Sequence, residues 1–272
     1  MTSEVRYQLL RPADAVERRE ACPVVYIPIG TIEWHGLHNP LGADTLQAEY
    51  LAVKCAQLGG GLVFPPLWYG ESRTESLMES TAADHEDIAG LMHLDPKNFS
   101  PECFIYSETE QSENYIRLLA HILNQADTLG FEVGTIIAGH YPLIDYARAA
   151  ALLHNKRRRR TGRMLAWAAV DYLFLRDKYS YAGDHAGGWE TSHCMAVDPG
   201  LVDLSALKPR GEKLTGVMWE MDPHDATAEF GKKTFGEAAE LITKETLHRL
   251  NNKPLYDQHG MYMAEGLWKN AT

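Results

Sequence analysis

A short segment near the N-terminus concentrates carboxylate and imidazole side chains. Glu33, His35, His38 and Asp44 stand in the stretch GTIEWHGLHNPLGADT, directly after the β-branched run 24–29. Residues two apart in extended chain lie on the same side, so Glu33 and His35 can reach one cavity, and Asp44 can curl back over it. This ligand mixture suits zinc, manganese or iron, and a carboxylate can bridge two ions. We therefore predict one or two divalent ions, with zinc the first choice, and place His38 outside the ligand set.

Two later segments carry the same kinds of side chain. His140 follows the apolar run 133–138, and a glycine-rich loop carries Asp184 and His185 shortly before Glu190. Glycines allow the backbone to approach a substrate, and a histidine exchanges protons near neutral pH. We therefore expect a proton-transfer role for His185.

Each of these residues also has a purely structural interpretation. Glu33 alone would be an ordinary surface acid, Asp44 a helix N-cap, and His140 a hydrogen-bonded structural histidine. The concentration of such residues at the ends of two predicted strands favours a metal site, because parallel-sheet proteins bind ligands at the carboxyl ends of strands.

The elements that must position these residues alternate along the chain. Apolar runs predict strands, helical spacing predicts helices that end at glycines, and the segment 70–110 shows weak periodicity and is interpreted as an extended loop. The predicted strands are 24–29, 62–64, 133–138 and 164–170, and the helices are 45–58, 112–129, 142–153 and 235–250. This alternation predicts an α/β protein with a mainly parallel central sheet.

Composition restricts the partners and the compartment. The 272 residues include 45% hydrophobic and 23% charged side chains, and the net charge is −11 with a pI near 5.5. This acidity disfavours a nucleic-acid partner, and the basic run 156–160 is interpreted as the solvated end of a helix. Four unpaired cysteines fit a reducing compartment, and no apolar run approaches the ~18 residues of a membrane span. We expect a cytoplasmic protein that contacts no membrane.

The order of these motifs resembles the creatininase family. The opening signature is Glu33-x-His35-Gly-x-His38 followed by Asp44-Thr45, and the later elements are Gly139-His140, Asp184-His185-Ala-Gly, Glu190-Thr-Ser and Ala226-Thr227. The resemblance spans roughly 20–250, within one expected domain over 1–272, and leaves the tail 253–272 unassigned. It implies a three-layer αβα sandwich, a homohexamer, and a metal pair held by Glu33, His35, Asp44 and His140, with Asp44 bridging.

The sequence departs from the creatinine-hydrolysing members at one ligand. Those members carry a metal-binding glutamate two residues after the equivalent of His140, and this chain has Pro142 there. With the ligands that the resemblance implies, Glu190 is the predicted fifth. Because proline cannot bind a metal, the second ion must rely on Glu190, be bound more weakly or be absent. Tyr141 matches the aromatic residue of the creatinine enzyme. The predicted substrate-binding residues are Tyr141, Trp189, Trp68 and Arg73, with Tyr69 and His85 as further candidates for the lining.

The expected reaction is the attack of a metal-activated water on the carbonyl of a small molecule, most simply a cyclic amide or another non-peptide C–N bond. His185, oriented by Asp184, would protonate the leaving nitrogen, and Glu190 completes the catalytic set. Two alternatives stay open. One is ring opening of a cyclic keto substrate resembling a sugar or inositol, and the other is a catalytically decayed protein that only binds a ligand.

Overall fold

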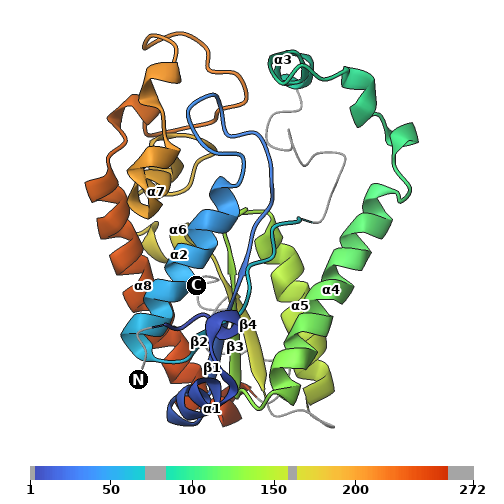
Figure 1. Ribbon diagram of the computed structural model, residues 1–272, viewed down its shortest axis with the longest axis vertical. Coiled ribbons are helices and arrows are strands. Elements are labelled where there is room, and N and C mark those ends of the chain that lie inside the picture. Colours follow the sequence, from blue (N-terminus) through green and yellow to red (C-terminus); the bar gives the residue numbers. More distant parts are fainter. Residues whose placement is uncertain (1–3, 71–83, 159–163, 257–272) are drawn as a thin grey trace, which may run out of the picture.

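The computed structural model describes residues 4–70, 84–158 and 164–256 (Figure 1). A four-stranded parallel sheet lies between two layers of helices. The strands are β1 Val24–Ile29, β2 Leu62–Val63, β3 Val133–Ala138 and β4 Leu165–Ala169. The helices are α1 Pro12–Ala21, α2 Ala43–Gly59, α3 His85–Leu91, α4 Glu108–Thr128, α5 Leu143–Arg158, α6 Asp171–Leu175, α7 Gly188–Val197 and α8 Ala228–Asn251.

Burial on both faces explains the apolar strands. All six residues of β1 and all six of β3 are buried. Alternate residues of β1 face opposite layers: Val24 and Tyr26 pack with α2 and α8, whereas Val25, Ile27 and Ile29 pack with α4 and α5. This pattern is typical of a parallel sheet covered by helices on both sides. The predicted three-layer αβα sandwich is confirmed.

The strand order β2-β1-β3-β4 places β1 and β3 side by side at the centre of the sheet, with Val24 opposite Val133 and Ile29 opposite Ala138. The chain runs outward from β1 to β2 and then returns to the other side of β1. In open α/β sheets, the carboxyl ends of the two strands at such a reversal frame the ligand site. The predicted ligands follow these two strands.

Some predicted boundaries are wrong. The extended loop expected over 70–110 contains α3 and two 3-10 turns in its described part, and α4 begins at Glu108 because Ser107 and Glu110 form a capping box. Helix α8 begins at Ala228, since the Thr227 hydroxyl caps the amide of Phe230. Residues 71–83, 159–163 and 257–272, which include parts of the predicted loop, basic run and tail, lie outside the described residues.

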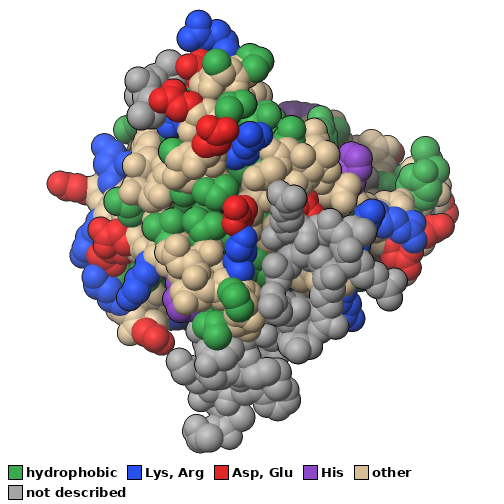
Figure 2. Space-filling model, turned by 90° about the horizontal axis from the view of Figure 1, so that it is seen from below, with side chains coloured by type: hydrophobic (Ala, Val, Ile, Leu, Met, Phe, Trp, Pro, Cys, Tyr) green, Lys and Arg blue, Asp and Glu red, His purple; other side chains and the backbone are tan. Residues whose placement is uncertain are grey.

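The face at the amino ends of the strands is shown in Figure 2, where acidic and basic side chains alternate around an apolar area. None of the described helices is both long and apolar enough to cross a membrane.

Candidate metal centre

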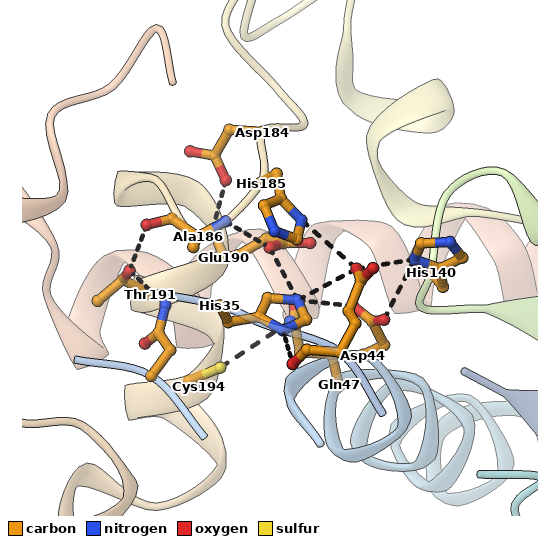
Figure 3. Close-up of polar contacts among 12 residues, drawn as sticks. His35, Asp44, Gln47, His140, Asp184, His185, Ala186, Glu190, Thr191 and Cys194 are labelled. Carbon is orange, nitrogen blue, oxygen red and sulfur yellow. Dashed lines mark hydrogen bonds and ion pairs between the residues drawn. The ribbon is translucent and has the colours of Figure 1, made fainter. Parts of the chain in front are cut away.

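The structure brings the predicted ligands together at the carboxyl ends of β1 and β3 (Figure 3). Glu33 and His35 lie in the loop after β1, Asp44 lies in the first turn of α2, and His140 follows β3. His140 Nδ1 is 3.0 Å from Glu33 Oε1 and 3.3 Å from Asp44 Oδ2, and His35 Nε2 is 3.1 Å from Asp44 Oδ1. All four side chains are at most 3% exposed.

Glu190 approaches the cluster from α7. Its Oε2 lies 3.6 Å from His35 Nε2 and accepts a hydrogen bond of 2.8 Å from the amide of Ala186. Two sets of three side chains can thus each hold a cation, with ligand atoms within 4.8 Å of one another: Glu33, Asp44 and His140 form the first set, and His35, Asp44 and Glu190 form the second. Asp44 belongs to both sets. The arrangement has the form of a dinuclear centre with a bridging carboxylate.

The electrostatics of this cluster fit divalent cations. Glu33, Asp44 and Glu190 are 1–2% exposed, and among the described residues they form ion pairs with histidines only. Glu33 Oε2 has no hydrogen-bond partner among the described residues. Buried carboxylates are costly unless they are paired or coordinate a metal, and burial raises the pKa of both Glu33 and Glu190. Bound cations would remove this cost.

The orientation of His35 also fits a ligand. Its Nδ1–H donates to the carbonyl oxygen of Glu33 at 3.2 Å, which directs Nε2 toward Asp44 and Glu190. Metal-binding histidines are commonly anchored in this way through the second ring nitrogen. Burial disfavours the charged ring, but the carboxylates of Asp44, Glu190 and Glu33 together outweigh burial and raise the pKa of His35 to about 10. A proton on Nε2 therefore takes the place of the cation in the metal-free chain.

We expect metal binding to release protons at neutral pH. The raised pKa values of His35 and Glu190 mean that the metal-free centre holds protons that a cation must displace. Metal affinity should therefore rise as the pH rises and fall as it falls. Zinc titrations by calorimetry, in buffers of different ionisation enthalpy, measure this release directly. A binding enthalpy independent of the buffer would contradict the assignment of these two ligands.

His185 lies at the edge of the centre. Its Nε2–H donates to the carbonyl of Trp34 at 2.8 Å, and its Nδ1 is 3.5 Å from Glu33 Oε1. The glycine-flanked loop that carries His185 is held in place, because the backbone of His185 exchanges two hydrogen bonds with Met218. Glu33, His35 and His185 also form a third possible cation-binding group, so the position allows either proton transfer or ligation.

Asp184 does not orient His185, contrary to prediction. Its carboxylate accepts hydrogen bonds from the backbone amides of Trp189 and Glu190, at 2.8 and 3.0 Å. It thus caps the first turn of α7, where the helix leaves amides without partners. Burial raises the pKa of Asp184 to about 7. Its function in the centre is therefore to fix the helix that presents Glu190.

Among the predicted substrate-binding residues, Tyr141 is the best placed. It follows His140 directly, and its hydroxyl is buried without a hydrogen-bond partner in the described residues. Trp189 does not fit that role: it is 0% exposed and packs in the core, with its Nε1–H donating to Asp171 Oδ2 at 3.0 Å. Trp68 lies against Gly42 just before α2, and Arg73 lies outside the described residues.

The two remaining candidates for the lining are Tyr69 and His85. Tyr69 is 62% exposed, and His85 begins α3 with its ring 5.6 Å from that of Phe99. His38, excluded from the ligand set, is hydrogen-bonded to the Ala186 carbonyl at 3.0 Å.

Sequence reasoning missed Asp171. It follows β4 just as His140 follows β3, and it is 6% exposed. The signal was a carboxylate directly after an apolar run. Burial raises its pKa to about 6, and its bond to the Trp189 indole holds the start of α7 against the sheet.

Gly139 sets how closely β3 approaches α2. A Cβ atom at Gly139 would lie 1.9 Å from the Asp44 carbonyl oxygen. Gly139→Ala should therefore push these elements apart and destabilise the protein by about 1–3 kcal/mol, as overpacking does. Gly236 in α8 is the matched control, since a Cβ there meets nothing within 4 Å and Gly236→Ala should stabilise the helix by ~0.5–1 kcal/mol. Denaturant unfolding measures both, and a shift of both variants in one direction would refute this packing argument.

The fold and the centre together define a class, that of α/β enzymes which hold divalent cations with carboxylates and histidines at the reversal point of a parallel sheet. The family model described as creatininase, creatinine amidohydrolase, matches residues 9–246. The chain therefore belongs to the creatininase family and is a hydrolase of the amidohydrolase type.

Individual relatives share limited sequence identity with this chain. The chain is 27% identical over 243 residues to a mycofactocin precursor peptide peptidase of Mycobacterium ulcerans, covering 79% of this chain and 81% of that protein. It is 35% identical over 66 residues to a 3-dehydro-scyllo-inosose hydrolase of Thermotoga maritima, a match that spans only 24% of this chain and 21% of that protein.

Solved creatininase structures share the fold. A crystal structure of creatinine amidohydrolase superimposes with a TM-score of 0.69 at 18% identity, covering 92% of this chain and 99% of that one. A creatininase variant of the Zn-Zn type gives 0.68 at 18% identity with the same coverage. A manganese creatininase gives 0.65 at 18% identity over 91% and 99% of the two chains.

Proposed function

We propose that this protein is a dinuclear, zinc-preferring hydrolase that cleaves the C–N bond of a cyclic amide or a related small non-peptide substrate. The main support for this proposal is that Asp44 belongs to both cation-binding sets. The proposal also includes a cytoplasmic location, which the four free cysteines support. It includes a homohexamer as well, which the family resemblance supports and which light scattering of the purified protein tests.

Different residues of the chain would have different roles in this reaction. The two sets would hold the cations, which when bound would lower the pKa of a water toward neutrality and polarise the carbonyl under attack. Tyr141 supplies a buried hydroxyl that is available to donate to the substrate carbonyl oxygen. Glu190 is held in place by the Ala186 amide and by the Asp184 cap on its helix.

His185 would transfer the proton. Burial lowers the pKa of His185 to about 3, so its ring is neutral in the metal-free chain. Because the Trp34 carbonyl accepts from Nε2–H, the lone pair of Nδ1 faces the centre. Nδ1 is then positioned to take a proton from the attacking water and deliver it to the leaving nitrogen.

A second candidate is the hydrolysis of a cyclic ketone. The 66-residue match to an inosose hydrolase favours it, and a centre that polarises a carbonyl would serve that reaction equally. The third alternative, a decayed protein that only binds a ligand, has less support than the two hydrolase candidates. Ligand binding alone does not require all five predicted ligands in one buried cluster.

Substrate screening of the zinc-loaded protein tests the proposal. The panel contains lactams and other cyclic amides, formamides, cyclic ketones and short peptides, the last because of the peptidase relative. We expect hydrolysis of a cyclic amide that a chelator abolishes and added zinc restores. Turnover of cyclic ketones alone would support the second candidate. Peptide cleavage alone would refute the assignment to a non-peptide bond, and full metal content without turnover would support the ligand-binding reading.

A further inference from the structure

A buried hydrogen bond joins α2 and α7 one helical turn beyond the metal ligands. Gln47 is three residues after Asp44, and His193 is three residues after Glu190, so each lies on the same helix face as a ligand. Gln47 Oε1 is 3.2 Å from His193 Nδ1. Gln47 is 5% exposed and His193 is fully buried. Figure 3 shows Gln47 on the helix that carries Asp44, next to Cys194 of α7.

A third helix completes this contact. His193 Nε2 lies 2.8 Å from the hydroxyl of Thr234 in α8, and the imidazole stacks on Phe235 with ring centroids 3.9 Å apart. Asp171 Oδ2 lies 3.6 Å from Nδ1 of the same ring. Both nitrogens of His193 are therefore engaged by neighbouring helices, and a buried network with its partners satisfied is rigid and specific in geometry.

We infer that Gln47, His193 and Thr234 form a positioning clamp that sets the separation of Asp44 and Glu190, and thereby the occupancy of the cation position formed by His35, Asp44 and Glu190. This inference rests on the proposed dinuclear function. Asp44 lies on α2 and Glu190 on α7, and a cation at this position needs both carboxylates within reach. A fixed distance between α2 and α7 would keep them close enough to share one.

The clamp should act on one cation position only. The position formed by Glu33, Asp44 and His140 takes its ligands from α2 and from the loops after β1 and β3, and none from α7. Loosening α7 therefore moves Glu190 and leaves this first set in place. A network that served only the stability of the fold would show no such selectivity.

The test uses full-length protein and two clamp variants. His193→Phe keeps a ring to stack on Phe235 but removes both nitrogens. Thr234→Val is milder and removes one hydroxyl. Thr246→Val is the matched control, because Thr246 is also a fully buried residue of α8, with its hydroxyl bonded to the Ile242 carbonyl at 2.8 Å and away from the clamp. Circular dichroism verifies that each variant folds.

Zinc titrations with a competing chelator give the dissociation constant of each position. We expect both clamp variants to weaken one position by about 10- to 100-fold, as loss of a supporting hydrogen bond to a metal site does, and to leave the other unchanged. Thr246→Val should bind like the unmodified protein. Unchanged zinc binding in both clamp variants, or equal weakening of both positions, would overturn the clamp. Absence of zinc from the unmodified protein would instead overturn the proposed function.

Discussion

Asp44→Asn is expected to lose both bound ions while the protein remains folded. The substitution keeps the volume of the side chain but removes the charge of the carboxylate common to both cation-binding sets. Loss of Glu33 or Glu190 would affect one set only, so Asp44 should be the most damaging single ligand to change. Elemental analysis of the purified variant measures the metal, and circular dichroism measures the fold.

Asp145→Asn serves as the control for this substitution, because the Asp145 side chain is 82% exposed on α5 and lies outside both sets. It should retain the full metal content. Full metal content and turnover in Asp44→Asn would contradict the bridging role and, with it, the dinuclear arrangement.

His185→Gln is expected to lower turnover by on the order of 10²- to 10⁴-fold while metal content stays intact. The side-chain amide of glutamine can still donate to the Trp34 carbonyl that now accepts from His185 Nε2–H. It has no basic nitrogen that can accept a proton from the attacking water, whereas the neutral imidazole offers Nδ1. Kinetics on a substrate from the screen and metal analysis on the same preparation give both values.

Each half of this prediction can fail separately. Loss of an ion from His185→Gln would make His185 a ligand, as its place in the group with Glu33 and His35 allows. Unchanged turnover would make it a structural residue that anchors the loop after β1.

The strands and the ligands that follow them were predictable from the sequence. The runs at β1 and β3 are apolar throughout because both faces of a parallel sheet are covered, and the predicted boundaries of these two strands are those in the structure. Glu33 and His140 were then placed at one edge of the sheet by the rule that parallel strands end together.

Helix α7 was not predictable by the same means. Eight of its ten residues are buried, including Glu190, Thr191, Ser192 and His193, so it has no polar face and no amphipathic period. Polar side chains of this helix are buried because one of them is a predicted ligand and others form a supporting hydrogen-bond network. The role of Asp184 was missed for the related reason that a capping carboxylate can be recognised only once its helix is known.

The most direct test of the account is the metal content of the unmodified full-length protein. After purification, zinc loading and removal of loosely bound ions, elemental mass spectrometry should find about two zinc ions per chain, because two sets of ligands share Asp44. Manganese loading should give the same stoichiometry with lower affinity, since zinc binds such sites more tightly. A protein that retains no zinc and no manganese, with its fold intact by circular dichroism, would contradict the metal-dependent mechanism as a whole.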